Sequence, residues 1–479
     1  MGEAEVNYWG GEPNFIAWAA LVLFAPFTLI CFARMRPHIA AAWTLIGAVM
    51  FLPEVIRFDL PALPPMDKLT IATTWVFVGC MWKARHRISR ARPFRGIDLF
   101  FVVVLVAQLG TIVTNGDALV TGPVTRQGLT LYDAFAGMVK DTLGLFLPFL
   151  IGRAMFRTRD ELNEVLRILV IAGLVYTAFA LFEVRMSPQS HRLLYGFHPA
   201  SFEMTIRGGG YRPTIFMLTG LGVAMFFLSA VIAAIARWKV GQSKGYVPAW
   251  LTLVLVLCKS TGAIVYAVFL VPIVALVRKP RFTLSLGLAL LVFTFPLLRG
   301  ADLFPTRQIT DVFMGVSEDR ALSLWFRFEN EDALLERARE RPLFGWGGYS
   351  RQRIFDEATG EDLSVTDGQW IIELGQRGVI GFVGLFGLLL WPVVQTYRAR
   401  KKITDESDRI LIGALALIVA INAVDLLPNG TFSFLPYFYS GILAGVLPAL
   451  SSERERRARG PAARAELRRR AARRELEPA

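Results

Sequence analysis

Long apolar blocks alternate with short polar connectors along this chain, from residue 14 to residue 450. Most blocks approach the roughly 20 residues that a helix needs to cross a hydrocarbon layer about 30 Å thick. A backbone in lipid has to satisfy its own hydrogen bonds, which restricts spanning segments to helices or closed barrels. The blocks are continuously apolar, whereas barrel strands alternate apolar and polar residues. The pattern therefore predicts an all-α polytopic membrane protein with about 12–13 transmembrane helices.

Composition and charge support this prediction. Hydrophobic residues make up 54% of the 479 residues, and the mean hydropathy is +0.46. All three cysteines fall in apolar blocks, so no disulfide framework is expected. The formal charge of +13 comes from Lys and Arg in short connectors and in the C-terminal tail, the distribution typical of cytoplasmic loops and not of a nucleic-acid surface. The sequence has no phosphate-binding P-loop and no ligand cluster at metal spacing, so we expect neither a metal nor a nucleic-acid partner.

The basic connectors also predict a topology. Basic residues are favoured on the cytoplasmic side of a membrane, and placing all these connectors there gives an orientation that alternates along the chain. They lie at residues 34–36, 83–95, 153–159, 237–244, 278–281 and 398–402 and in the tail, 454–474. The loops that then face outward lie near residues 58–66, 115–128, 186–211, 299–370 and 427–432. The acidic N-terminus has no basic n-region, so we expect a retained first span, an outward N-terminus and a cytoplasmic C-terminus.

The block Val247–Val277 tests this topology. Both Lys244 and Arg278 have to face the cytoplasm, so the chain between them must go out and return. A helix of these 31 residues would be roughly 46 Å long at 1.5 Å per residue, which is too short for two full crossings. We expect two short helices that meet near Lys259–Gly262, at a turn sheltered within the protein.

The segment 299–370 is the longest stretch without a plausible span. Long loops in compact proteins are usually functional or disordered, and this one has the features of an ordered loop. Residues 330–341 favour a helix that places Leu334, Leu335 and Ala338 on one face and stops at Pro342. The chain thereby divides into an N-terminal bundle 1–298, the late loop 299–370, C-terminal helices 371–450 and a basic tail 451–479.

A glycine-rich turn follows the predicted loop helix. Gly345 and Gly347 can adopt backbone conformations that are closed to other residues. Such a turn can direct several N–H groups at one anion, and it can equally be a plain connection between a helix and a loop. The sequence leaves both interpretations open.

Two motifs lie in and directly after the late loop. Arg341-Pro-Leu-Phe-Gly-Trp-Gly347 precedes Asp367-Gly-Gln-Trp-Ile-Ile-Glu-Leu-Gly-Gln-Arg-Gly-Val-Ile-Gly381. The pair resembles the O-antigen ligase/polymerase superfamily, in which a "PLFGxG" segment precedes a "HNxxLxxLxxxGxxG" segment in the large periplasmic loop. Arg212-Pro-Thr resembles the Arg-containing entry to a span in that family, and Cys258-Lys-Ser-Thr-Gly262 resembles its "(S/T)-x-S-(R/K)-(G/S)" turn. The resemblance in span layout covers most of the chain, and the motifs lie between residues 212 and 381.

The resemblance implies a GT-C-like fold and a glycosyltransferase of the bacterial inner membrane. Such an enzyme takes a glycan from an undecaprenyl-diphosphate carrier at the periplasmic face, without a metal or another cofactor, and polymerises repeat units into an exopolysaccharide or O-antigen. Membrane lipids, a flippase and a chain-length regulator are the further partners it implies. A ligase that passes the glycan to lipid A core or to protein is the alternative. A transporter of lipid-linked glycans would instead show repeated halves and midplane ionisable residues, and we find neither in the sequence.

This chemistry needs a base for the acceptor hydroxyl and cations for the diphosphate. The usual His of the family aligns with Asp367, a departure that favours a polymerase over a standard ligase, and Asp367 is the candidate catalytic base. Arg212, Arg327 and Lys259 are the candidates for binding the diphosphate, since a guanidinium can bind two phosphate oxygens at once. Each of the four also has a plainer interpretation. Asp367 can be an inert surface carboxylate, and Arg212 can be an interfacial anchor. Arg327 can form an ion pair on a helix, and Lys259 can extend its ammonium group to the membrane surface.

Other polar residues are weaker candidates. Arg207 competes with Arg212 for the diphosphate, and His191 or His198 in the same outer loop can replace the missing His as base. Lys140 and the adjacent Asp141 lie in an apolar block, where ionisable groups are costly and are often functional. All of these residues equally fit a solvated or interfacial position.

Overall fold

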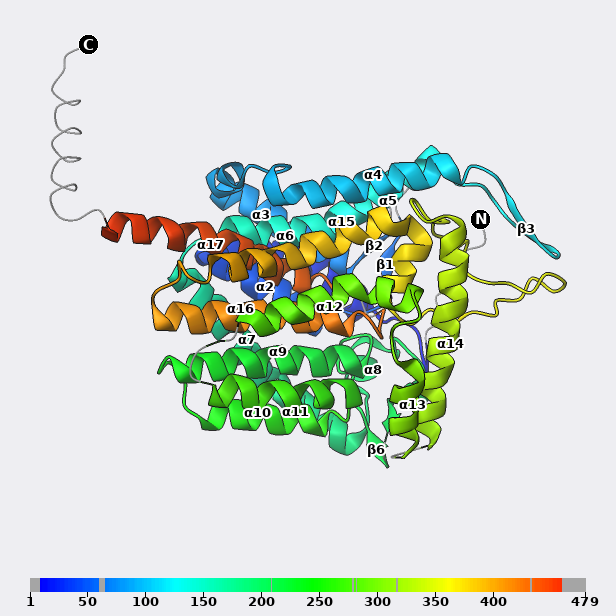
Figure 1. Cartoon of the computed structure of the whole chain (residues 1–479). Helices are drawn as coiled ribbons and strands as arrows, with labels where there is room; N and C mark the ends of the chain where they lie inside the picture. Colours follow the sequence, from blue (N-terminus) through cyan, green and yellow to red (C-terminus); the bar gives the residue numbers. More distant parts are fainter. Residues whose placement is uncertain are drawn as a thin grey trace, which may run out of the picture.

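The computed structural model describes residues 9–59, 65–207, 209–277, 280, 282–315, 318–430 and 433–458. Its helices run side by side in one bundle (Figure 1). Within the described part, eight helical segments are long and apolar enough to cross a membrane. Four shorter apolar helices accompany them: Pro37–Phe51, Tyr246–Leu257, Thr261–Leu276 and Leu435–Pro448. The prediction of an all-α polytopic membrane protein is confirmed.

Among the described residues, the first half of the chain supplies eight helices and two β-hairpins. Polar residues cap several of these helices, as Asp67 does for α3 and Thr158 for α7, where the side chains accept N–H groups of the first turn. The helices are α1 (Phe15–Arg34), α2 (Pro37–Phe51), α3 (Lys68–Ala91), α4 (Leu99–Thr114), α5 (Leu131–Asp141), α6 (Leu147–Met155), α7 (Arg159–Met186) and α8 (Ser190–Tyr195). The strands β1 (Arg57–Phe58) and β2 (Met66–Asp67), and β3 (Leu119–Thr121) and β4 (Val124–Arg126), form antiparallel pairs.

The described part of the second half adds a third hairpin and nine helices. The hairpin pairs β5 (Ile206–Arg207) with β6 (Gly210–Tyr211). The helices are α9 (Gly220–Lys239), α10 (Tyr246–Leu257), α11 (Thr261–Leu276), α12 (Phe282–Gly300), α13 (Thr306–Met314), α14 (Glu318–Glu340), α15 (Gln369–Ala399), α16 (Glu406–Asp425) and α17 (Leu435–Ala458). Short turns of other helix types complete the list at Gly96–Asp98, Thr142–Phe146 and Phe202–Thr205. The predicted tail 451–479 is described only as far as Ala458. Residues 278, 279 and 281 of one basic connector also lie outside the described residues.

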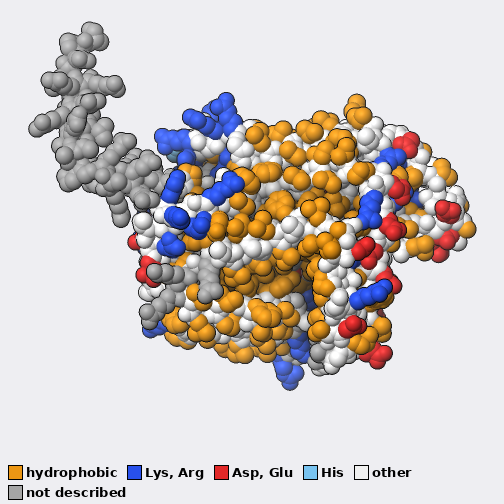
Figure 2. Space-filling model, in the orientation of Figure 1, with side chains coloured by type: hydrophobic (Ala, Val, Ile, Leu, Met, Phe, Trp, Pro, Cys, Tyr) orange, Lys and Arg blue, Asp and Glu red, His pale blue; other side chains and the backbone are white. Residues whose placement is uncertain are grey.

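The two ends of the bundle differ in chemistry. The three hairpins, α13 and α14 lie together at one end, which we call the loop end (Figure 1). Helices α3, α9 and α15 finish at the opposite end, which we call the connector end. Figure 2 shows Lys and Arg side chains over the connector end, whereas most of the Asp and Glu side chains in this view lie at the loop end. The described residues of the connectors that the sequence placed on one side of a membrane thus share one end of the molecule.

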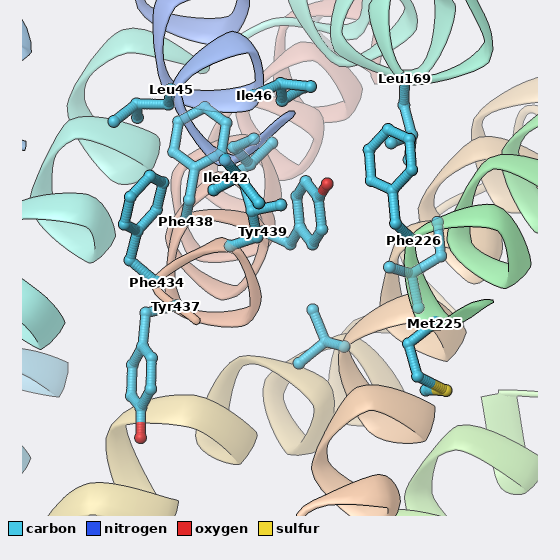
Figure 3. Packing of buried hydrophobic residues seen from close by; sticks show 14 of the residues in the cluster. Leu45, Ile46, Leu169, Met225, Phe226, Phe434, Tyr437, Phe438, Tyr439 and Ile442 are labelled. Atoms are coloured by element: carbon cyan, nitrogen blue, oxygen red, sulfur yellow. The ribbon is translucent and has the colours of Figure 1, made fainter. Parts of the chain in front are cut away.

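Aromatic residues of α17 fill the centre of the bundle (Figure 3). Phe434, Tyr437 and Phe438 are all fully buried. Helix α17 lies directly against α6, because Gly152 of α6 faces Phe438 and Gly441 of α17 faces Phe149 at distances that leave no room for a Cβ atom. Small residues allow this close approach of two helices in a membrane protein.

The expected pair of short helices is confirmed as α10 and α11. The chain turns between them at Cys258–Ser260, where Lys259 has a left-handed φ of 52°. Cys258 and Ser260 are buried, so the turn is sheltered by the protein as the sequence predicted. The late loop also begins as expected, except that its helix is longer: α14 starts at Glu318 instead of residue 330.

The end and the buried face of α14 agree with the prediction. Leu334, Leu335 and Ala338 are buried, and the helix stops at Glu340, just before Pro342. The earlier start adds residues 318–329, which are mostly polar or exposed and give no strong periodic signal. Helix α14 therefore extends along the loop end and carries Arg327 toward the rest of the bundle.

Candidate functional site

The two late motifs meet in the structure because one docks onto a break in the other. Helix α15 is interrupted at Gly378, whose φ of 64° and ψ of −166° are not helical. A break of this kind leaves backbone N–H and C=O groups without partners in the helix. Four hydrogen bonds from the preceding loop satisfy them: Val379 N to Pro342 O (2.8 Å), Ile380 N to Leu343 O (3.3 Å), Trp346 N to Gly375 O (2.8 Å) and Gly347 N to Gln376 O (2.9 Å).

Glycine is required on both sides of this contact. A side chain at Gly378 would collide with the backbone of Leu343, and one at Gly345 would lie 2.6 Å from the carbonyl carbon of Gln376. The N–H groups of Gly345 and Gly347 both donate within the protein, the former to Arg341 O at 2.9 Å. Both N–H groups therefore have partners within the protein, and the turn packs against the break in α15.

Arg327 and Asp367 form an ion pair at the loop end. Arg327 Nε lies 3.2 Å from Asp367 Oδ2, and the side chains are 40% and 33% exposed. Arg327 comes from α14, and Asp367 lies two residues before α15. The Gln369 N–H donates to Leu426 O at 2.9 Å, which fixes this start of α15 against the end of α16. The structure thus joins two residues that the sequence proposed separately.

Arg212 lies in the loop before α9, and Lys259 lies in the turn between α10 and α11, close to the same loop. Arg212 Nη2 donates to Ser260 Oγ at 3.2 Å, which ties the loop before α9 to the turn between α10 and α11. The Lys259 ammonium lies next to Gly210, 2.3 Å from the position that a Cβ would take there. Arg207 is the cross-strand partner of Gly210 in the β5–β6 hairpin. Three predicted cation positions therefore belong to one small region.

Electrostatics connects this region to the Arg327–Asp367 pair. Burial lowers the pKa of the Arg212 guanidinium, and the like charges of Arg207 and Arg327 lower it further. An arginine remains protonated under these conditions because its ordinary pKa is above 12. Arg212 Nε is buried and has no hydrogen-bond partner among the described residues. The site therefore concentrates positive charge and leaves a buried donor to be satisfied.

Asp425 adds a second carboxylate beside Arg212. It is buried at the end of α16, and its negative charge acts on the Arg212 guanidinium. Asn429 Nδ2 donates to Asp425 Oδ1 at 3.2 Å, and the Tyr266 hydroxyl of α11 lies within hydrogen-bonding reach. The sequence signal for Asp425 was a carboxylate near the end of an apolar block, which alone did not distinguish it from an interfacial residue.

Glu183 holds the loop that carries Arg212, and sequence reasoning missed it. It lies in the last turn of α7 and is fully buried. Glu183 Oε2 accepts the N–H groups of Thr214 (2.9 Å) and Ile215 (2.8 Å), and Oε1 accepts the N–H of Ser190 (2.8 Å). Ile215 has a left-handed φ of 55°, so this carboxylate stabilises a strained turn. Its only sequence signal was a Glu inside an apolar block.

The histidines proposed as substitute bases have structural contacts. Both ring nitrogens of His191 are engaged: Nδ1 with Phe197 O at 2.8 Å, and Nε2 as acceptor of the Glu54 N–H at 3.2 Å. Burial lowers the pKa of His191 to about 4. The backbone of His198 pairs with Trp9, and burial, followed by the charge of Arg192, lowers its pKa as well.

Lys140 belongs to a different group of charges. It is exposed on α5, next to the buried Asp141. Asp141 Oδ2 lies 3.1 Å from Arg377 Nη1, and Glu373 Oε1 lies 3.3 Å from the same nitrogen. This network links α5 to α15 near the helix break, and the structure shows no contact that brings Lys140 to the Arg327–Asp367 pair.

No family model matches this chain, and no curated protein is similar enough to be counted as a relative. A function therefore has to be argued from the site: Asp367 and Asp425 among the cations Arg207, Arg212, Lys259 and Arg327. Within the described residues there is no group of three or more His, Cys, Asp or Glu side chains that could hold a metal ion.

Proposed function

We propose that the chain is a membrane glycosyltransferase that polymerises undecaprenyl-diphosphate-linked oligosaccharide repeat units at the periplasmic face of a bacterial inner membrane. The observation that carries the proposal is the gathering of Arg207, Arg212, Lys259 and Arg327 around Asp367 and Asp425. A diphosphate leaving group develops negative charge as its bond to the sugar breaks, and preorganised cations stabilise that charge. The partially exposed Asp367 supplies a base beside them.

A groove beside the site supports a lipid-borne substrate. Figure 2 shows a hollow with hydrophobic walls between α12 and the α10–α11 hairpin. Toward the connector end, apolar residues line the same interface, including Val274 of α11, Leu284 of α12 and Leu417 of α16. An isoprenoid chain in this groove would stay in an apolar environment while its diphosphate reaches the cations at the loop end.

The residues divide the reaction between them. Arg212, Lys259 and Arg327 bind the diphosphate, with Arg207 adding charge from the hairpin. The bond between the anomeric carbon and the diphosphate oxygen breaks, and the anomeric carbon bonds to a hydroxyl oxygen of the acceptor glycan. The hydroxyl proton passes to Asp367. The lipid diphosphate leaves with the electron pair of the broken bond, so no oxidant, metal or nucleotide is needed.

Incubation of the purified protein with lipid-linked repeat units tests the proposal. A ladder of products on a gel is expected for a polymerase. A product that forms only when a separate acceptor is added indicates a ligase, and translocation without any new product indicates a transporter. Lack of turnover with every donor and acceptor contradicts the proposed enzyme class.

Asp367→Asn is the matching variant, because it keeps the shape of the side chain and removes the base. We expect the rate of polymer formation to fall by about 10²–10⁴-fold, the usual contribution of a general base. Asp362→Asn is the control: Asp362 also pairs with an arginine of the late loop, Arg353 at 2.5 Å, but it is not a member of the proposed site. Normal chain length and rate in Asp367→Asn would remove Asp367 from the mechanism.

A further inference from the structure

A cavity of about 390 Å³ lies inside the loop end, next to the cation site. Helices α3, α9, α16 and α17 and the segment after α2 form its walls. Asp425 and Gly430 lie on its border, and a Cβ at Gly430 would be 3.0 Å from the carbonyl oxygen of Asp367. The cavity therefore borders the proposed reaction centre, and its volume is typical of a small-molecule site.

The cationic groups in the cavity wall are already paired with carboxylates. Lys68 Nζ lies 2.6 Å from Glu54 Oε1 and also donates to three backbone carbonyl oxygens. Arg57 pairs with Asp59 at 3.5 Å, and the Asp67 side chain caps the first turn of α3. This wall therefore lacks the excess of cations found around Arg212. The diphosphate fits the cation site, whereas the cavity fits a ligand without charge.

One hydroxyl group in the wall needs a partner. Tyr439 is 2% exposed, and its hydroxyl has no hydrogen-bond partner among the described residues. Buried tyrosine hydroxyls are normally hydrogen-bonded. Figure 3 shows this hydroxyl directed to the side of α17 on which Phe226 lies, away from Tyr437. Both Tyr439 and Phe226 line the cavity, so the unsatisfied hydroxyl belongs to a residue of its wall.

The remaining wall combines polar and apolar surfaces. Asn422 Nδ2 donates to Ser229 Oγ at 3.1 Å, and both residues line the cavity together with Thr219 and Ser433. Met225 and Phe226 provide an apolar face. A sugar ring presents hydroxyl groups at its edge and C–H groups on its faces, which matches amide and hydroxyl groups beside an apolar surface.

We infer that this cavity binds a neutral sugar unit of the glycan, next to the diphosphate site. The inference rests on the proposed function for the identity of the glycan, but its evidence is the cavity itself: a wall without an excess of cations, the buried Tyr439 hydroxyl without a partner among the described residues, and a border formed by Asp425 and by Gly430 next to the Asp367 backbone. The sugar comes either from the lipid-linked donor or from the acceptor chain, and both present the same chemistry to the wall.

Two variants close or alter the cavity. Gly222 of α9 lines it, and a Cβ there meets only Met217 Sδ and Thr219 Oγ1, each at 3.8 Å. Gly222→Ala therefore fits, whereas Gly222→Phe fills the cavity. Tyr439→Phe removes the unsatisfied hydroxyl. Tyr437→Phe is its matched control, since Tyr437 points to the other side of α17 (Figure 3), where its hydroxyl donates to Leu385 O at 3.4 Å.

Direct binding to the purified protein measures the effect with three probes. They are the lipid-linked glycan extracted from the cells that make the protein, the glycan released from it by mild acid, and undecaprenyl diphosphate without sugar. We expect Gly222→Phe to weaken binding of a sugar-bearing probe at least about tenfold by steric exclusion, and Tyr439→Phe to weaken it about fivefold through one lost hydrogen bond. Gly222→Ala and Tyr437→Phe should bind like the wild type, and all variants should bind undecaprenyl diphosphate normally.

The pattern of loss identifies the source of the sugar. Weaker binding of the lipid-linked glycan alone assigns the cavity to the donor, and weaker binding of the released glycan assigns it to the acceptor. Wild-type affinity of Gly222→Phe for both sugar-bearing probes overturns the inference, as does an equal loss for undecaprenyl diphosphate or an absence of sugar binding to the wild type. Intact sugar binding without turnover contradicts only the proposed function.

Discussion

Glu183 offers a sharp test of how the site is built, because one buried carboxylate holds the loop of Arg212. Glu183→Gln keeps the size and shape of the side chain but replaces one acceptor oxygen by an NH₂ group that cannot accept. The three N–H donors around it come from Ser190, Thr214 and Ile215. A glutamine that turns its oxygen toward Thr214 and Ile215 keeps two bonds and places its NH₂ against the N–H of Ser190.

The expected cost follows from this geometry. A hydrogen bond to a charged group contributes about 1.5–3 kcal/mol, and a buried donor left without an acceptor costs about 1–3 kcal/mol. Glu183→Gln should therefore lower the free energy of unfolding by about 3 kcal/mol. Glu183→Ala loses all three bonds and should cost more. In Glu183→Gln the Arg212 loop should stay close to its position, whereas in Glu183→Ala it should open.

Thermal unfolding of the purified protein and hydrogen exchange of residues 205–217 measure the two effects. Glu164→Gln is the control on the same helix, since Glu164 is 35% exposed and forms only a 3.7 Å pair with Arg167. We expect little change in that variant, because exposed ion pairs contribute about 0–1 kcal/mol. Equal stability of the Glu183 and Glu164 variants, or unchanged protection of residues 205–217 in Glu183→Ala, would refute the role assigned to Glu183.

Three further predictions concern the helix break, the loop histidine and the cation site. Gly378→Ala should destabilise the protein by more than about 2 kcal/mol, since it combines a left-handed φ with a backbone collision. Gly96 has the same φ of 64° but open space around it, so Gly96→Ala should cost only about 1 kcal/mol. Unfolding in denaturant compares the two variants. The pKa of His191 is about 4 in the folded protein and near 6.5 in the unfolded chain. Its contribution to stability is therefore complete above about pH 6.5 and declines as the pH falls toward 4, by at most about 3 kcal/mol. The melting temperature of His191→Gln should depend less on acid pH than that of the wild type, and an equal dependence would contradict this. Arg212→Gln should weaken binding of undecaprenyl diphosphate by about tenfold or more, from the loss of a charge-assisted contact, and unchanged affinity would exclude Arg212 from the anion site.

The sequence predicted the helices well where hydrophobicity alone decides them. The apolar blocks correspond to the spanning helices, and the length of Val247–Val277 was enough to predict the α10–α11 pair. Pro342 ended α14 as expected, because proline cannot continue a helix. The start of α14 was missed by twelve residues, since Glu318–Glu329 lacks a clear apolar period and is ordered by contacts with the rest of the loop end.

The members of the candidate site were named one by one, but their arrangement was not predicted. Asp367, Arg212 and Lys259 lie in the motifs of the resemblance and Arg327 lies upstream of the late pair, whereas the ion pair and the shared electrostatic field depend on contacts between distant segments. Glu183 was missed for a physical reason: in an apolar block, the sequence shows that a polar residue is costly, but not which backbone donors satisfy it. Gly345 and Gly347 were named as candidate anion donors, and the structure shows that they pack against α15.

The break in α15 has a consequence for how the protein can be assembled and altered. Residues 342–347 supply hydrogen bonds that α15 cannot make for itself at its break, and unsatisfied backbone groups in hydrocarbon cost several kcal/mol each. This helix is therefore incomplete as an independent inserting unit and becomes whole only after the preceding loop has folded back onto it. Loop and helix have to be exchanged together in any chimera, since neither is a detachable module.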